Sequence, residues 1–266
     1  MDSFWRVQDP RKPLFPDVLW SKPERKNAAG KLVIVGGNVH SFAAVATAFG
    51  IALRVGVGTI KIILPDSLKR TLLPVVKDQF RNVVFASSNQ SGSFAKEAIY
   101  ELRAAAGFAN LILFIGDSGN NSETAALVEI YLHEDKTTPV IITRDVVDLI
   151  KNSAEMVLNR ENTHLVVSLS QLQKLFREIY YPRVITFSQS AKQITETLHK
   201  FTISYPVAIT LWHAGNLFVA NGGVVISQKF EQPLRVWSGE VAVREAVWQI
   251  WQPDVVKAAA SAWAEE

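Results

Sequence analysis

The sequence predicts an α/β protein in which a mostly parallel sheet is covered by helices on both faces. Short apolar segments alternate with amphipathic segments through most of the chain, as expected for right-handed βαβ units. Residues 111–115 are apolar at every position, which is typical of a strand covered on both faces. An Asn-Gly-Gly turn at residues 221–223 joins two apolar runs and predicts a hairpin, so antiparallel strands should be added at one edge near the carboxyl end.

The individual elements follow from local patterns in chain order. The first apolar run ends at Gly36-Gly37, and a run of small apolar residues then starts a helix at Ala43. The expected strands are residues 31–35, 59–64, 83–86, 111–115, 140–143, 165–167, 207–212, 216–220 and 224–227. The expected helices are residues 43–55, 93–106, 123–133, 145–151, 168–178, 238–251 and 254–264.

Polar residues that precede these helices predict their N-caps, because a side-chain oxygen there accepts hydrogen bonds from the first turn. Ser168 and Gln171 have the spacing of a capping box. The other expected caps are Ser93, Ser122, Asp145 and Ser238.

Composition limits the class of protein. The chain has 266 residues, of which 48% are hydrophobic, and it has no cysteine, which excludes disulfides, thiolate catalysis and cysteine-based metal sites. No apolar run approaches ~20 residues and the start of the chain lacks a signal-peptide core, so we expect a cytoplasmic protein with no membrane partner. The net charge of +3 arises in residues 1–31, which hold seven basic and four acidic side chains. We interpret residues 1–30 as a solvated arm of one domain, residues 1–266, and expect no nucleic-acid partner.

Common catalytic motifs are absent from the sequence. There is no P-loop, Gly-x-Ser-x-Gly or His-Glu-x-x-His sequence. The Gly56-Val-Gly58 segment lacks the third glycine of a dinucleotide fingerprint and lies between a helix and a strand, which is the wrong order. Of the five histidines, His40 is the best candidate for a site because it follows the Gly-Gly turn.

Three polar loops at helix starts are candidate ligand sites. The turn Gly36-Gly37-Asn38 should leave bare backbone N–H groups at a sheet edge, where anions are commonly bound. The loop 116–122, with Gly116, Asp117 and Gly119, is either a ligand loop or a simple turn with a cap. Ser238, Gly239 and Glu240 suit a helix start, and a glycine with a carboxylate there can also bind a phosphate and supply a base.

Several segments, taken in order, resemble the ADP/ATP-dependent NAD(P)H-hydrate dehydratases, which are carbohydrate kinase-related members of the ribokinase-like superfamily. The segments are Lys31…Gly36-Gly37, Ala52-Leu53-Arg54-x-Gly-x-Gly58, Gly116-x-x-Gly119, Pro139-Val-Ile-Ile-Thr-Arg-Asp145 and Ser238-Gly239-Glu240. The resemblance covers roughly residues 22–251 and implies a three-layer αβα fold, often in a homo-oligomer. It also implies ADP or ATP with Mg²⁺ as cofactors and repair of hydrated NADH or NADPH, a lyase reaction.

The chain departs from the pattern of this family at its functional motifs. The family's Gly-Thr-Gly-Asp segment, which forms an anion hole and carries the catalytic base, corresponds to Trp237-Ser238-Gly239-Glu240. Asp117 stands where the family has proline, and Gln171 where it has glutamate. The family's histidine near Ser168 and its lysine near Trp212 are missing.

Three hypotheses follow from the resemblance and its departures. The first is a nucleotide-dependent dehydratase or related small-molecule kinase, with Glu240 as base and an anion hole from the N–H groups of residues 238–240. Its cleft for a nucleotide substrate would be lined by Gly36, Gly37, Asn38, His40, Gly116 and Gly119, with Asp117 and Asp145 near the nucleotide or metal. The second is a protein that binds a nucleotide or metabolite on the same fold without turnover. The third is an assembly protein, since five of seven tryptophans lie at or after Trp212.

Overall fold

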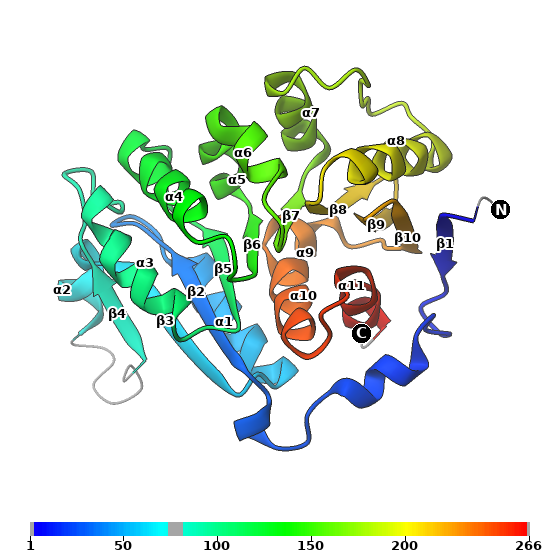
Figure 1. Cartoon of the computed structure of the whole chain (residues 1–266). Helices are drawn as coiled ribbons and strands as arrows, with labels where there is room; N and C mark the ends of the chain where they lie inside the picture. Colours follow the sequence, from blue (N-terminus) through cyan, green and yellow to red (C-terminus); the bar gives the residue numbers. More distant parts are fainter. Residues whose placement is uncertain (1–2, 74–81, 265–266) are drawn as a thin grey trace.

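A single ten-stranded sheet runs through the molecule (Figure 1). The computed structural model describes residues 3–73 and 82–264. The spatial order of strands is β1-β10-β9-β8-β7-β6-β5-β2-β3-β4, parallel throughout except where β9 runs antiparallel to β8 and β10. The strands are β1 Trp5–Gln8, β2 Lys31–Gly36, β3 Thr59–Pro65, β4 Val83–Ala86, β5 Leu111–Gly116, β6 Val140–Thr143, β7 Thr163–Val167, β8 Ala208–His213, β9 Asn216–Asn221 and β10 Val224–Lys229.

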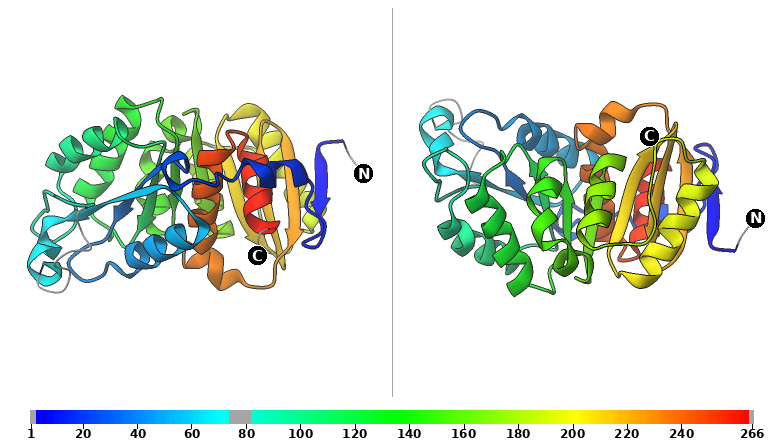
Figure 2. Two further views of the ribbon diagram at one scale, coloured as in Figure 1. Left: turned by 90° about the horizontal axis from the view of Figure 1, so that it is seen from below. Right: turned by 90° about the horizontal axis from the view of Figure 1, so that it is seen from above.

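Helices cover both faces of the sheet and make three layers. Helices α1, α10 and α11 lie on one face and α3 to α8 on the other, as the views from below and above show (Figure 2). The helices are α1 Ala43–Val55, α2 Lys69–Leu72, α3 Ile99–Ala106, α4 Ser122–Glu134, α5 Asp145–Leu149, α6 Ala154–Leu158, α7 Leu169–Glu178, α8 Ala191–Ser204, α9 Pro233–Trp237, α10 Glu240–Trp251 and α11 Val255–Ala264. None of the helices in the described part of the chain is long and apolar enough to cross a bilayer.

The alternation of side chains along β5 explains why this strand is apolar throughout. Ile112 and Phe114 belong to the core beneath α3 to α8, whereas Leu111, Leu113 and Ile115 belong to the core beneath α1 and α10. Successive side chains of a strand point to opposite faces, so a strand between two helical layers needs apolar residues at every position. The three-layer fold predicted from the sequence is therefore confirmed.

The predicted hairpin is also confirmed. Residues Asn221 to Val224 turn the chain between β9 and β10, and Gly222 and Gly223 adopt φ values of 54° and 80°, which glycine reaches without steric cost. The nine predicted strands all form. Helices α2, α6, α8 and α9 were not predicted from the sequence.

The amino-terminal segment is part of the fold, and its interpretation as a solvated arm was wrong. β1 pairs in parallel with β10 and forms the edge of the sheet beyond the hairpin. The buried amide of Gln8 donates hydrogen bonds to Gln228 Oε1 and to the carbonyl of Ala260, each at 2.7 Å. The following segment, which includes the 3-10 helix Pro16–Ser21, crosses the outer side of α11 (Figure 2).

Four predicted N-caps were wrong, whereas the capping box of Ser168 and Gln171 is confirmed. Asn121, not Ser122, caps α4 by accepting hydrogen bonds from the N–H groups of Glu123 and Thr124. Ser93 lies in a turn before the 3-10 helix Lys96–Ala98. Helix α3, which ends at Ala106, therefore starts at Ile99, later than expected.

The other two errors fall at loops that the sequence also marked as candidate sites. The N-cap of α5 is Arg144, and Asp145 is the first helical residue. The N-cap of α10 is Gly239, with no side-chain cap, and the hydroxyl of Ser238 donates instead to the carbonyl of Arg235 at 3.2 Å. Neither Asp145 nor Ser238 therefore caps the helix that follows it.

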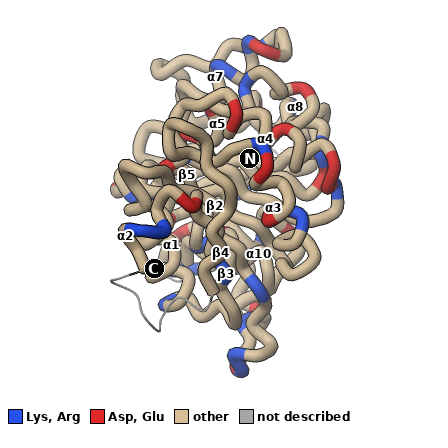
Figure 3. Tube along the Cα trace, turned by 90° about the vertical axis from the view of Figure 1, so that its left-hand side faces the viewer, with Lys and Arg blue, Asp and Glu red and all other residues tan. Residues whose placement is uncertain are grey.

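Charged residues are spread over the surface. Seen from the β4 edge, basic and acidic residues are interspersed (Figure 3).

Candidate functional site

The carboxyl ends of β2 and β5 meet at the point where the strand order reverses. From β2 the chain continues outward through β3 and β4, then returns to β5 on the other side of β2. Gly36 pairs with Gly116 here, and a Cβ on Gly36 would lie 2.3 Å from the carbonyl oxygen of Gly116, so only glycine allows this approach. Open α/β sheets bind ligands in the crevice outside such a switch point. The predicted Gly36 and Gly116 loops are therefore adjacent.

The N–H groups of the first loop are not bare, contrary to the expectation from sequence. The N–H of Gly37 donates to the Gly116 carbonyl at 2.9 Å, and that of Asn38 to the Ser41 carbonyl at 2.8 Å. The N–H of His40 donates to Asn38 Oδ1 at 2.7 Å. This turn therefore fixes the loop against β5 and does not present free donors to an anion.

Asp117 links the second loop to α1 and to the loop after β6. Its Oδ2 accepts hydrogen bonds from the hydroxyl of Ser41 at 2.8 Å and the N–H of Ala44 at 2.9 Å, at the start of α1. Its Oδ1 pairs with Nη2 of Arg144 at 2.7 Å. Burial opposes ionisation, but these hydrogen bonds and the charge of Arg144 outweigh it and hold the pKa of Asp117 below its usual value. Asp117 is therefore an ionised, fully engaged carboxylate.

The carboxylate of Asp145 occupies the backbone donors of the loop 116–119. Its Oδ1 accepts from the N–H of Asp117 at 2.9 Å, and its Oδ2 accepts from those of Ser118 and Gly119 at 2.8 and 3.1 Å. Successive N–H groups that converge in this way are the arrangement by which loops bind phosphates. Here these N–H groups donate to the carboxylate of Asp145 and not to a bound phosphate.

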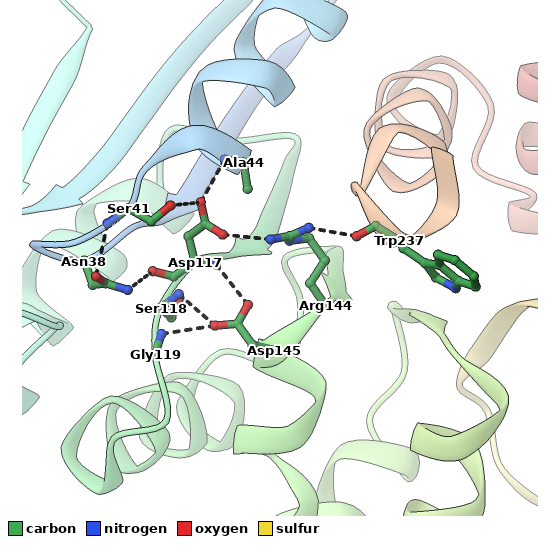
Figure 4. A network of polar contacts seen from close by, with 9 residues as sticks. All are labelled: Asn38, Ser41, Ala44, Asp117, Ser118, Gly119, Arg144, Asp145 and Trp237. Atoms are coloured by element: carbon green, nitrogen blue, oxygen red, sulfur yellow. Dashed lines mark hydrogen bonds and ion pairs between the residues drawn. The ribbon is translucent and has the colours of Figure 1, made fainter. Parts of the chain in front are cut away.

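Arg144 lies between the two walls of the site (Figure 4). Besides its pair with Asp117, its Nη1 donates to the carbonyl of Trp237 at 2.7 Å. Its Cδ lies 3.2 Å from the position that a Cβ on Gly239 would take, so the side chain covers the start of α10. Arg144 itself has a φ of 58°, an uncommon conformation for a residue with a side chain. The arginine thus occupies the space between the loop of Asp117 and the helix start of Gly239.

A groove of about 500 Å³ opens beside these contacts. Of the residues predicted for the site, four line it: Asn38, Asp117, Gly119 and Asp145. The others lie outside its lining: Gly36, Gly37, His40, Gly116, Ser238, Gly239 and Glu240. Its lining also includes the polar residues Ser41, Thr143, Arg144, Asp148, Ser168, Ser170, Gln171 and Lys174.

An aromatic hollow of about 420 Å³ lies beside this groove. Residues 167, 168, 170, 236 and 237 line both spaces, so the two hollows adjoin and share these walls. Phe187, Trp212 and His213 line the second, and the rings of Trp212 and Trp237 meet edge to face at 6.2 Å. A polar, charged hollow therefore lies beside an aromatic one.

Glu240, the predicted base, is held by two arginines. Its Oε1 accepts from Nη2 of Arg235 at 2.7 Å and from Nε of Arg244 at 3.3 Å. Burial alone would raise the pKa of Glu240, but the hydrogen bond from Arg235 and the charges of both arginines outweigh it and hold the pKa below its usual value. A paired carboxylate with a lowered pKa is a weak proton acceptor.

Direct binding of Mg²⁺, which the resemblance to the family implies, would compete with contacts that the acids of the groove already make. Magnesium takes carboxylate oxygens together with water and phosphate. All four carboxylate oxygens of Asp117 and Asp145 already accept hydrogen bonds or an ion pair, and Asp148 is bound by Lys174 at 2.6 Å. No cluster of three acidic or histidine side chains suited to a metal occurs in the described part of the chain.

Three residues that line the groove were not predicted from the sequence: Arg144, Asp148 and Lys174. Gln171 had been noted only as a cap and as a departure from the family, yet its amide also donates to the Arg144 carbonyl at 2.7 Å and to Asp148 Oδ2 at 2.9 Å. The Thr-Arg-Asp segment at the end of a predicted strand was the available signal for Arg144. The partners across the groove come from α7, which no local pattern connects with β6.

Comparisons of the structure with solved proteins match the whole fold. A ribokinase-like superfamily protein from Enterococcus faecalis superposes with a TM-score of 0.73 at 14% identity, over 99% of this chain and 86% of that chain. The fold is ribokinase-like. The ADP/ATP-dependent NAD(P)H-hydrate dehydratase from Bacillus subtilis, co-crystallised with ATP and Mg²⁺, gives 0.61 at 14% identity, over 94% of this chain and 85% of that chain. A phosphomethylpyrimidine kinase from Clostridium difficile gives 0.53 at 6% identity, over 87% and 96%.

Comparisons of the sequence give no such relative. No family model matches the chain, and no curated protein matches it. At 6–14% identity the structural likeness establishes the fold alone.

Proposed function

We propose that this ribokinase-like protein binds a nucleotide in the two adjoining hollows and does not dehydrate hydrated NAD(P)H with Glu240 as base. The fold supports the first part, because a solved protein of this fold was co-crystallised with ATP. The contacts of Glu240 support the second part. This is the second of the hypotheses drawn from the sequence.

One observation carries the proposal: a charged hollow and an aromatic hollow adjoin and share Trp237 in their walls. The first hollow is lined by two cations, Arg144 and Lys174, and by three aspartates, Asp117, Asp145 and Asp148. Trp237, which is 51% exposed, lines both hollows. Planar rings pack well on exposed tryptophan, and guanidinium groups bind phosphate oxygens through paired N–H donors. A nucleotide has a planar base and an anionic phosphate chain, so its two parts suit the two hollows.

The position of Glu240 argues against the dehydratase mechanism in this chain. A general base must come within hydrogen-bond reach of the proton that it removes. Glu240 does not line the groove, and Arg144 covers the adjacent helix start at Gly239. Removal of a proton by Glu240 would require two arginines to release it and a third to move.

Binding is tested by titration of ADP, ATP and NADPH, with tryptophan fluorescence and calorimetry as readouts. We expect ADP or ATP to bind, and Trp237→Ala to weaken binding at least fivefold, about 1 kcal/mol of lost stacking. Trp20→Ala is the matched control, because Trp20 is 89% exposed and lies outside the groove. If none of the three compounds binds at millimolar concentration, the proposal is wrong.

Catalysis is tested separately with hydrated NADH and ATP or ADP. We expect no nucleotide-dependent loss of the hydrate above the rate without protein. Turnover that disappears in Glu240→Gln would instead establish the dehydratase hypothesis, while leaving nucleotide binding intact.

A further inference from the structure

We propose that a third hollow, on another face of α7, binds a small organic anion with an aromatic ring. This arginine hollow has a volume of about 740 Å³ and is lined by residues 173, 176, 177, 180, 181 and 183–185. Helix α7 contributes Gln171 and Lys174 to the groove, but Gln173, Phe176 and Arg177 to the arginine hollow. The arginine hollow shares no lining residue with the two hollows of the candidate site, so it is a separate place for a ligand.

The connection from α7 to α8 forms one wall of the arginine hollow. Residues 179–190 pass between the two helices without a helix or strand of their own (Figure 1). A connection of roughly 12 residues without secondary structure is uncommon in a compact domain and often carries function. The N–H of Tyr181 donates to the Phe176 carbonyl at 2.8 Å, and the amide of Gln173 donates to the carbonyl of the buried Ile185. These contacts fix the connection against α7, so the hollow is preformed.

The walls of the arginine hollow are mostly apolar and aromatic. Phe176 and Ile185 are buried, and the ring of Phe176 lies 4.6 Å from that of Tyr181. Tyr180 and Val184, which also line the hollow, are 93% and 74% exposed. Single exposed apolar side chains are ordinary, whereas several gathered around a hollow mark a binding surface. An aromatic ring of a ligand would pack against these side chains.

The charged side chains of the lining are both positive. They are Arg177 and Arg183, and no acidic residue of the described chain lines the hollow. Neither arginine makes an ion pair or a side-chain hydrogen bond with another described residue, nor does Glu178, the acid next to Arg177 in sequence. In the groove, by contrast, each of the two cations is paired with an aspartate. The arginine hollow therefore offers positive charge that the protein itself does not neutralise.

These features define the class of ligand. Sites for small molecules are usually apolar hollows of about 300–1,000 Å³ with a few polar groups that fix the orientation of the ligand. A guanidinium binds a carboxylate or a phosphate through paired N–H donors, and planar rings pack on tyrosine and phenylalanine. Burial raises the pKa of Tyr181, and the charge of the nearby Arg183 opposes this rise. The cation and the aromatic wall are thus close enough for one ligand to contact both.

The test is a fluorescence titration of the full chain with 8-anilinonaphthalene-1-sulfonate, an aromatic anion that emits strongly in apolar surroundings. We expect saturable binding to the native chain. In the double variant Arg177→Gln with Arg183→Gln, the affinity should fall at least tenfold, because the paired N–H donors and the charge are lost. In Tyr180→Ala it should fall at least threefold, because part of the aromatic wall is removed.

Matched variants separate these effects from changes in folding or in the candidate site. Arg177→Lys with Arg183→Lys keeps the charge, so it should retain part of the affinity. Arg103→Ala removes an exposed arginine that is paired with Glu134, and it should leave the titration unchanged. Trp237→Ala alters the groove and should also leave it unchanged. Thermal melting of each variant shows whether it is folded at the temperature of the titration.

Competition against the bound dye identifies the acidic group that is preferred. Naphthalene-1-carboxylate and 1-naphthyl phosphate should both displace the dye, whereas the neutral naphthalene-1-carboxamide should displace it at least tenfold less well. The acid that displaces the dye at the lower concentration shows whether a carboxylate or a phosphate fits better.

Three results would overturn the inference. The first is equal affinity of the dye for the native chain and for the glutamine double variant. The second is displacement by the carboxamide as strong as displacement by the two acids. The third is loss of dye binding in Trp237→Ala, which would place the dye in the candidate site. Failure of ADP, ATP and NADPH to bind would remove the proposed function and leave this inference standing.

Discussion

Glu245 is a residue of α10 whose carboxyl group is buried in the core, 1% exposed, facing β7, β8 and α11. Its Oε1 accepts from Nε1 of Trp263 at 2.8 Å and from the hydroxyl of Thr210 at 3.2 Å, and its Oε2 lies 3.4 Å from Nε2 of His164. Burial raises the pKa of Glu245 to about 8 and lowers the pKa of His164 to about 4. At neutral pH the acid is therefore protonated and the imidazole is neutral.

This pair gives the free energy of unfolding a defined dependence on pH. The unfolded chain loses the Glu245 proton near the ordinary value of 4.5, whereas the folded chain keeps it to about 8, so stability falls as pH rises through that range. The unfolded chain protonates His164 below 6.5 and the folded chain only below about 4, so this residue has the opposite effect in that interval. The two effects cancel between pH 4.5 and 6.5. From pH 6.5 to 8 the effect of Glu245 dominates, and stability should fall by about 1 kcal/mol.

Glu245→Gln should remove this fall, because the amide does not titrate. Urea unfolding of both proteins at pH 6.5 and pH 8 measures the difference. Glu134→Gln, an exposed acid paired with Arg103, is the control and should retain the fall. A native protein equally stable at both pH values would contradict the assignment of a neutral acid in the core.

Individual site residues were predictable only in part, for a reason visible at Arg144. The glycines and acids at strand ends were marked by composition, and four of those marked residues line the groove. Arg144 was missed because its role depends on Asp117 and Trp237, which lie 27 and 93 residues away in sequence. A single sequence shows which residue ends a strand but not which side chain crosses to meet it.

At the scale of elements, the strands were predicted best and the helix starts worst. Buried strands have unbroken apolar runs, which few other segments share. An N-cap is decided by which of two or three adjacent polar residues turns its side chain inward, as at Asn121 and Ser122. Short helices such as Ala154–Leu158 and Pro233–Trp237 have too few turns for a periodic pattern, so they were missed.

The start of α4 tests this distinction directly. Asn121→Ala should lower the free energy of unfolding by about 1–2 kcal/mol, because its Oδ1 accepts from two N–H groups of the first turn and also from Asn89 Nδ2. Ser122→Ala should change it by less than about 0.5 kcal/mol, since that exposed residue only begins the helix. Urea unfolding curves of the two variants decide the question. A larger loss of stability in Ser122→Ala than in Asn121→Ala would instead identify Ser122 as the N-cap, as the sequence predicted.

At the scale of the whole molecule, the sheet joins the two ends of the chain. The amide of Gln8 in β1 contacts Gln228 in β10 and Ala260 in α11, so the edge strand, the hairpin and the last helix share one buried contact. The sequence did not predict this because an edge strand of four residues has only a weak pattern, and its charged neighbours favoured a solvated arm. The ribokinase-like core was predictable, whereas its closure by the amino terminus depends on contacts more than 200 residues apart.

Gln8→Ala should therefore destabilise the entire fold rather than fray one end. The change leaves Gln228 Oε1 and the Ala260 carbonyl without this donor, and the N–H of Leu14 without its acceptor at 3.1 Å. Buried polar groups that lose a partner cost about 1–3 kcal/mol, which lowers the melting temperature of a chain of this size by roughly 3–10 °C. Asp9→Ala, at the next and exposed position, should shift it by less than about 2 °C. Calorimetry of the native chain and the two variants measures both shifts in melting temperature. We expect each protein to unfold in a single transition. If Gln8→Ala melts with the native chain, or shows a separate early transition for the amino terminus alone, β1 is an appendage and not part of the cooperative sheet.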